Sequence, residues 1–307
     1  MTGFADVVAG PRAGAAPGPG NVSVKSLEAL EIAIGRRVDG LLAGDYRSAF
    51  TGVGSELAQV RPYQAGDDVR RIEWNVTART GVPHSRVELA ERVLVTWLVL
   101  DASASMAFGT ADRRKADVAE GVALALGHAA TRRGNRLGLV AFGAGEPRLR
   151  RARQGRRALL DTLAAVREGP AGDGTLSDGL SIVNGVARQR SLVAVVSDFR
   201  GPREWRRPLL HVAARHPTLA IEIRDPREQE LQDVGELRLV DPETGRQLRV
   251  DTSSAKLRRR FAEAAAVERR SLETLFASAG VRHVVLSTEG DWLRPLAAFL
   301  RRSDRVG

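Results

Sequence analysis

The sequence predicts an α/β fold with a doubly wound, mostly parallel sheet, preceded by a small N-terminal β-rich region. The main observation is a continuous apolar run at 93–100 that ends directly at Asp101, as in a strand buried on both faces. Short apolar runs then alternate with helical patterns to the C-terminus, which is typical of parallel sheets with crossover helices. A chain of 307 residues with 43% hydrophobic content can bury a large core, and the absence of cysteine excludes disulfides and thiolate metal sites.

The first 92 residues change character twice. Residues 1–22 are rich in Gly, Ala and Pro and are expected to be disordered. Residues 23–42 carry apolar side chains at three- and four-residue spacing, which predicts an amphipathic helix. Residues 43–92 are punctuated by glycine and lack a helical period, so we expect short strands there. The predicted organisation is a tail at 1–22, a helix with a β-rich region at 23–92 and a main domain at 93–307.

Within the main domain, apolar runs between turn residues predict strands, and longer runs with helical spacing predict helices. After the strand at 93–101 we expect, in order, a helix at 114–132, a strand at 137–142, helices at 157–167 and 176–188, a strand at 192–197, a helix at 207–215, a strand at 219–223, a hairpin at 237–250, a helix at 254–279, a strand at 281–286 and a helix at 292–302.

Polar side chains follow the first buried strand at a regular spacing. Asp101 ends the strand, and Ser103 and Ser105 follow at intervals of two residues. In an open parallel sheet the carboxyl ends of the central strands line the ligand crevice, so these three side chains are expected to converge there. Hydroxyl and carboxylate oxygens are the ligands that hard cations such as Mg²⁺ prefer.

A second acid, Asp198, follows the strand at 192–197 in the same way. Between the two acids, a Gly-rich loop at 172–174 leads into a helix with Thr175 near its start, although Asp173 and Ser177 lie in the same loop. Each piece alone has an ordinary structural explanation as a helix cap or a turn residue. Together, on these elements, they favour a metal site, with Mg²⁺ as the first choice and Mn²⁺ or Ca²⁺ as alternatives.

The set Asp101-x-Ser103-x-Ser105, Thr175 and Asp198 resembles the metal-ion-dependent adhesion site of von Willebrand factor A domains, over about residues 93–300. The resemblance implies a Rossmann-like doubly wound sheet. It also implies that the two serines and the threonine ligate the ion directly, that the acids act largely through water, and that one coordination position stays open.

The upstream block Gly66 to Trp74, GDDVRRIEW, strongly resembles the bacterial domain of unknown function 58. Members of that family join this block to a von Willebrand factor A-like domain and are commonly encoded beside MoxR-type AAA+ ATPases. Many members also carry N-terminal membrane helices, and no such helix is predicted here. The charged residues of the block could form a buried network around Trp74, which we favour, or a surface for a partner.

Enzymatic readings have less support. The sequence contains no Gly-x-Ser-x-Gly elbow and no phosphate-binding loop, and its five histidines lack metal-ligand spacing. A metal-dependent phosphotransferase or hydrolase could use Asp101 as its nucleophile, but such enzymes need a lysine for the phosphoryl group. Lys115 is the one candidate near the site, and its position on a helix predicts a surface side chain instead.

The net charge of +10 raises the alternative of an arginine-rich RNA-binding protein. All but three of the 47 basic residues are arginine, in short scattered clusters such as 148–157, and aromatic residues make up 5% of the chain. Few bases could stack on so few rings, so a solvated surface is favoured and nucleic acid is not expected as a partner. We therefore expect a non-enzymatic, cytoplasmic, metal-dependent binding module, an adaptor or co-chaperone of a MoxR-type AAA+ ATPase.

Overall fold

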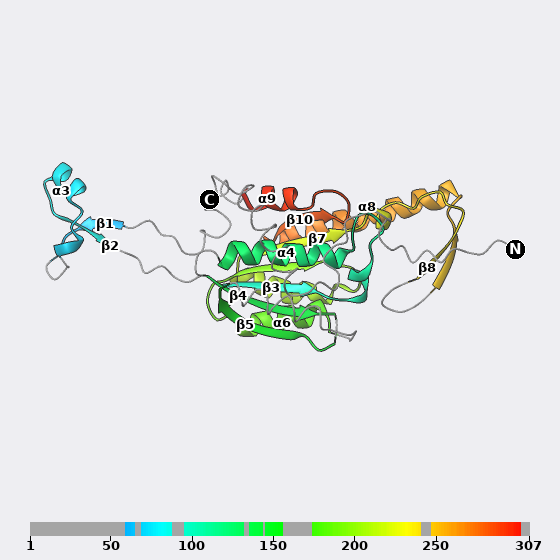
Figure 1. Cartoon of the computed structure of the whole chain (residues 1–307), viewed down its shortest axis with the longest axis horizontal. Helices are drawn as coiled ribbons and strands as arrows, with labels where there is room; N and C mark the ends of the chain where they lie inside the picture. Colours follow the sequence, from blue (N-terminus) through cyan, green and yellow to red (C-terminus); the bar gives the residue numbers. More distant parts are fainter. Residues whose placement is uncertain are drawn as a thin grey trace.

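The computed structural model describes residues 59–64, 69–87, 95–131, 135–143, 145–155, 174–240 and 247–301. These residues form a six-stranded sheet flanked by helices, together with two antiparallel sheets of two strands each. Figure 1 shows the large sheet with helices on both of its faces. The predicted tail at 1–22 and the helices predicted at 23–42 and 157–167 lie outside the described residues.

The six-stranded sheet has the order β10-β7-β6-β3-β4-β5, and all neighbours are parallel except β4 and β5. Its strands are β3 (Val95–Asp101), β4 (Arg136–Phe142), β5 (Arg148–Gln154), β6 (Leu192–Ser197), β7 (Thr218–Arg224) and β10 (Arg282–Ser287). Counted in chain order within the sheet, this is 3-2-1-4-5-6, the doubly wound order in which the direction of winding reverses between β3 and β6. The predicted fold class is confirmed.

Side chains alternate along the strands and build a core on each face of the sheet. On β3, Leu98 and Leu100 face α4 (Lys115–Thr131) and α9 (Leu293–Arg301). Trp97 and Val99 face the opposite core, to which α6 (Leu176–Val186), α7 (Arg206–Arg215) and α8 (Ala255–Ser278) contribute. All seven residues of β3 are buried, as the continuous apolar run predicts.

Strand β5 is absent from the sequence prediction because arginine dominates it. It pairs antiparallel with β4 at the edge of the sheet, and Arg150, Arg151 and Arg153 are exposed. Because few residues of an edge strand are buried, its sequence need not contain an apolar run. Charged side chains are common on such strands. The part of the 148–157 arginine cluster that lies in β5 therefore has a structural explanation: its side chains lie on an exposed edge strand.

A small unit precedes the main sheet in the chain. Strands β1 (Gln59–Pro62) and β2 (His84–Val87) pair antiparallel, with the short helices η1 (Val69–Arg71) and α3 (Trp74–Thr80) between them. The expected short strands are present, whereas α3 was not predicted. Trp74 is 69% exposed, so the expectation that it lies inside a buried charge network is wrong. Asp67 and Asp68 lie outside the described residues.

The predicted hairpin near residue 240 is confirmed as β8 (Glu236–Val240) paired with β9 (Gln247–Asp251), and its turn at 241–246 lies outside the described residues. Helix α8 follows, and the hydroxyl of Ser254 accepts the N–H of Leu257 at its start. None of the helices in the described ranges is long and apolar enough to cross a membrane. The domain boundary near residue 92 stays a prediction, because residues 88–94 are not described.

Candidate metal centre

The carboxylate of Asp101 is buried at the switch point of the sheet. Asp101 is the last residue of β3 and is 5% exposed. Its Oδ1 accepts the N–H of Ser103 at 2.9 Å, and its Oδ2 accepts the hydroxyl of Ser197 at 2.5 Å. The Ser197 hydroxyl itself accepts the N–H of Phe199 at 2.9 Å. These bonds tie the end of β3 to the end of β6 and hold the carboxylate in one orientation.

The two serines place their hydroxyls side by side. Ser103 precedes the short helix η2 (Ala104–Ala107), and this turn brings the oxygens of Ser103 and Ser105 to 3.1 Å from each other. An octahedral Mg²⁺ with ligands at about 2.0–2.1 Å has neighbouring ligand oxygens about 2.8–3.0 Å apart. The spacing of the two hydroxyls therefore suits adjacent positions around one small cation.

Gly143 fixes the position of Ser103. It follows β4 with φ of 87°, a left-handed conformation that costs glycine little. A Cβ at this position would lie 2.5 Å from the backbone nitrogen of Ser103 and 2.7 Å from its Cα. The backbone of Ser103 can therefore approach the end of β4 this closely only because residue 143 has no side chain.

Asp198 follows β6 and is buried as well. Its carboxylate accepts the N–H of Arg200 at 3.1 Å and a hydrogen bond from the Ser105 side chain. The intervening Phe199 has φ of 52°, which is rare for a bulky residue, and its buried ring packs against Trp205 and Phe276 at centroid distances of 5.5 and 5.0 Å. The aromatic packing holds the turn that presents Asp198 to the serines.

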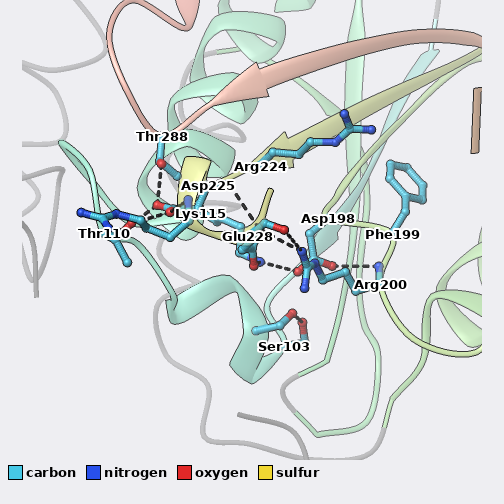
Figure 2. Close-up of polar contacts among 12 residues, drawn as sticks. Ser103, Thr110, Lys115, Asp198, Phe199, Arg200, Arg224, Asp225, Glu228 and Thr288 are labelled. Atoms are coloured by element: carbon cyan, nitrogen blue, oxygen red, sulfur yellow. Dashed lines mark hydrogen bonds and ion pairs between the residues drawn. The ribbon is translucent and has the colours of Figure 1, made fainter. Parts of the chain in front are cut away.

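Lys115 is the main departure from the sequence prediction. We expected a surface side chain, and the structure buries it completely, at 0% exposure. Its Nζ donates to Asp198 Oδ2 at 2.6 Å and to Glu228 Oε1 at 2.8 Å (Figure 2). Glu228 belongs to the short helix η4 (Pro226–Glu228) after β7. A lysine thus joins the acid of β6 to an acid beyond β7.

The two aspartates have opposite pKa shifts. Burial, together with the neighbouring charge of Asp198, raises the pKa of Asp101 to about 6 despite its hydrogen bonds from Ser103 and Ser197. Burial alone would also raise the pKa of Asp198, but the ammonium group of Lys115 and hydrogen bonds from Arg200 and Ser105 together outweigh burial and lower that pKa below its ordinary value. Asp198 is therefore the firmly ionised member of the pair, and the local negative charge favours a cation near Asp101.

Thr175 lies at the start of α6, as predicted, and its contacts are those of a helix cap. Its hydroxyl donates to Asp178 at 2.7 Å, and the Asp178 N–H donates back at 3.2 Å. This capping box is the ordinary structural explanation for the residue. Ser177 lies half-buried in the first turn of α6, and Asp173 lies outside the described residues. The role of Thr175 as the metal ligand of this loop stays a prediction.

A third buried aspartate, Asp225, lies at the same edge of the sheet. Asp225 follows β7 and accepts the N–H of Thr110 at 2.7 Å, the hydroxyl of Thr110 at 2.5 Å and the hydroxyl of Thr288 at 2.7 Å (Figure 2). It also accepts the N–H of Arg227 at 2.9 Å, while its own N–H donates to Glu228. This network connects the loop before α4, the end of β7 and the segment after β10.

The donor set fits a divalent cation with oxygen ligands. Ser103 and Ser105 supply two neutral oxygens at a suitable spacing, and Asp101 and Asp198 supply negative charge next to them. Both carboxylates already accept hydrogen bonds in fixed directions, which suits a role beside the ion or through water. When bound, the cation would supply an electrophilic centre for an acidic group.

The strand order defines a doubly wound α/β protein that places an acid and two hydroxyls at the switch point of its sheet. The chain belongs to the family described as "Protein of unknown function DUF58", whose model matches residues 59–271. This confirms the family that the GDDVRRIEW block indicated.

The chain is 42% identical to the uncharacterized protein Rv1480 of Mycobacterium tuberculosis over 281 residues, which is 90% of this chain and 88% of that protein. The uncharacterized protein Mb1516 of Mycobacterium bovis matches with the same identity and coverage. Among solved structures, BatB from Bacteroides thetaiotaomicron aligns with a TM-score of 0.43 and 9% identity, over 68% of this chain and 98% of BatB. The SpRpn10 VWA domain aligns with a TM-score of 0.38 and 16% identity, over 67% and 94% of the two chains.

Proposed function

We propose that this protein is a metal-dependent protein-binding module in which a divalent cation, Mg²⁺ before Mn²⁺ or Ca²⁺, captures a carboxylate of a partner. The observation that carries the proposal is the pair of serine hydroxyls 3.1 Å apart beside two buried aspartates. Von Willebrand factor A-like folds commonly serve protein interaction, and the switch point of such a sheet is the usual place for a ligand.

The chemistry of the ligands supports a partner that carries an acid. Ser103 and Ser105 are neutral, so they leave the cation most of its positive charge, whereas a cage of carboxylates would quench it. A carboxylate from the partner would then complete the coordination sphere. By family resemblance, the proposed partner is a MoxR-type AAA+ ATPase, for which this chain would act as adaptor or co-chaperone in the cytoplasm.

The contacts of Lys115 disfavour the alternative of a phosphotransferase that uses Asp101. Both of its carboxylate contacts are short, and it is fully buried, so its ammonium group is engaged within the protein rather than presented to a phosphoryl group. In addition, both oxygens of Asp101 accept hydrogen bonds from Ser103 and Ser197, which leaves neither oxygen free to attack a phosphoryl group. Mg²⁺-dependent turnover of phosphoesters that is lost in Asp101→Asn would contradict this conclusion.

The decisive experiment is affinity purification of a MoxR-type ATPase from the same genome on Ser103→Ala and Asp101→Ala variants, with and without chelator. We expect both variants and the chelated wild type to lose the ATPase, because each lacks part of the cation site. Ser103→Ala should lower the free energy of unfolding by about 1 kcal/mol at most, since its hydroxyl is only partly buried. Retention of the ATPase by either variant, or by the wild type in chelator, would refute the proposal.

The chain offers a matched control for the serine variant. Asp251 and Ser253 form the same turn as Asp101 and Ser103, with a bond of 2.9 Å from the serine N–H to the aspartate, after strand β9 instead of at the switch point. Ser253→Ala should therefore leave binding unchanged. A Thr175→Ala variant in the same series decides the loop ligand: lost binding supports ligation, and a loss of stability of about 1 kcal/mol alone supports the cap.

A further inference from the structure

Lys115 occupies a position that general physical chemistry disfavours. It is the first residue of α4, where the helix dipole presents its positive end, and its side chain is fully buried. Burying an ammonium group is costly unless carboxylates compensate it. Asp198 and Glu228 do so at 2.6 and 2.8 Å, from the turn after β6 and from η4, which lie 83 and 113 residues further along the chain.

The ammonium group of Lys115 and the hydroxyl of Ser105 contact the same carboxylate. Asp198 accepts a hydrogen bond from the Ser105 side chain and an ion pair from Lys115. Figure 2 shows Lys115 reaching Asp198 from the side of Glu228, with Ser103 on another side of Asp198. A cation held by the serines would therefore lie near a permanent positive charge, with one carboxylate between the two.

We propose that Lys115 acts as an internal cation that opposes the divalent ion, so that the ion binds firmly only when a partner carboxylate is added. The inference rests on the proposed function, because it concerns the same ion. Like charges in a partly buried site repel strongly at the effective dielectric constant of proteins. Because Lys115 already forms an ion pair with Asp198, the site keeps its geometry before the ion binds. A partner carboxylate offsets the repulsion between Lys115 and the ion, so metal and partner bind cooperatively.

A purely structural role for Lys115 makes the opposite prediction. If the lysine serves only to orient Asp198, its removal should disorder that carboxylate and weaken the binding of the divalent ion. If it opposes the ion, its removal should strengthen that binding. A change at Glu228 tests the same idea in the opposite direction, because Lys115 forms ion pairs with both Glu228 and Asp198. Neutralising Glu228 leaves the lysine facing Asp198 alone, which should weaken ion binding.

The test measures Mn²⁺ affinity of the purified full-length chain by calorimetry and by the electron paramagnetic resonance of free Mn²⁺, with and without acetate as a carboxylate probe. We expect Lys115→Met to bind Mn²⁺ at least about tenfold more tightly than wild type, and Glu228→Gln to bind it more weakly. Acetate should tighten Mn²⁺ binding in wild type and have a smaller effect in Lys115→Met. Lys256→Met, which changes an exposed lysine near the start of α8, should match wild type.

Lys115→Met leaves the buried carboxylate of Asp198 and the half-buried carboxylate of Glu228 without their cation, which can unfold the variant. The double variant Lys115→Met/Glu228→Gln keeps the formal charge of the wild-type cluster while it removes the ammonium group, and it too should bind Mn²⁺ more tightly than wild type. Equal or weaker Mn²⁺ binding in the folded variants, while wild type binds Mn²⁺, would overturn the role of Lys115 and leave the proposed function intact. Absence of Mn²⁺ binding in every variant, with acetate present, would overturn both.

Discussion

Replacing Gly143 by alanine should damage the candidate site through the backbone alone. Alanine in the left-handed conformation at φ of 87° costs about 1–2 kcal/mol. The new Cβ would also lie 2.5 and 2.7 Å from backbone atoms of Ser103, which cannot rotate away, so the serine turn must shift. Overpacking of this kind costs about 1–3 kcal/mol. We therefore expect a total loss of about 2–5 kcal/mol in the free energy of unfolding.

Gly155 provides the control for the Gly143 variant. Its φ of 89° is nearly the same, and a Cβ there would meet no atom within 4 Å. Gly155→Ala should lose only the conformational part, about 1–2 kcal/mol, and should bind Mn²⁺ as wild type does. Urea denaturation gives the stabilities, and Mn²⁺ titration gives the state of the site. If Gly143→Ala matched Gly155→Ala in both measurements, the close approach to Ser103 would not position the serine.

Two further predictions concern other parts of the chain. The pKa of Asp225 lies below its ordinary value because hydrogen bonds from Thr110, Thr288 and the Arg227 N–H outweigh the effect of burial. The ionised Asp225 therefore contributes to the free energy of unfolding above a pH of about 4, and this contribution is lost as the pH falls further. Asp225→Asn should lower the free energy of unfolding by about 2–3 kcal/mol at pH 7 and by less in acid. Urea denaturation across a range of pH would measure both values. Trp205 is 3% exposed, so Trp205→Ala should lower the free energy of unfolding by about 3–5 kcal/mol. Trp74 is 69% exposed, so Trp74→Ala should lower it by under about 1 kcal/mol. If the GDDVRRIEW block binds the partner, Trp74→Ala should also weaken retention of that partner. A wild-type level of partner retention by Trp74→Ala would exclude that role.

Local patterns in the sequence were sufficient to predict most of the described fold. The strand at 192–197 was predicted with the bounds that β6 has, because a run of buried apolar residues leaves few alternatives. Strand β5 was missed because its stability comes from pairing with β4 and not from its own apolar content. Trp74 was expected to be buried because the charged residues around it could pair in a network, and no local signal marks an aromatic side chain that stays exposed.

The candidate site was predicted in part for the same reason. Asp101 and Asp198 each end an apolar run, so the topology of a parallel sheet was enough to bring them to one edge. Ser197, Lys115 and Glu228 were not assigned to the site. Lys115 contacts acids 83 and 113 positions away, and helical periodicity gives no information on such long-range pairs. The scarcity of lysine in a chain so rich in arginine was the available signal.

The exposed arginines of β5 disfavour pairing between the sheet edges of two copies of this chain. A strand added to that edge would have to pair with a backbone flanked by Arg150, Arg151 and Arg153, and would bring a second set of guanidinium groups against the first. Electrostatic repulsion therefore opposes edge-to-edge growth into fibres. Threonines at these three positions would suit the same strand and would remove this electrostatic repulsion.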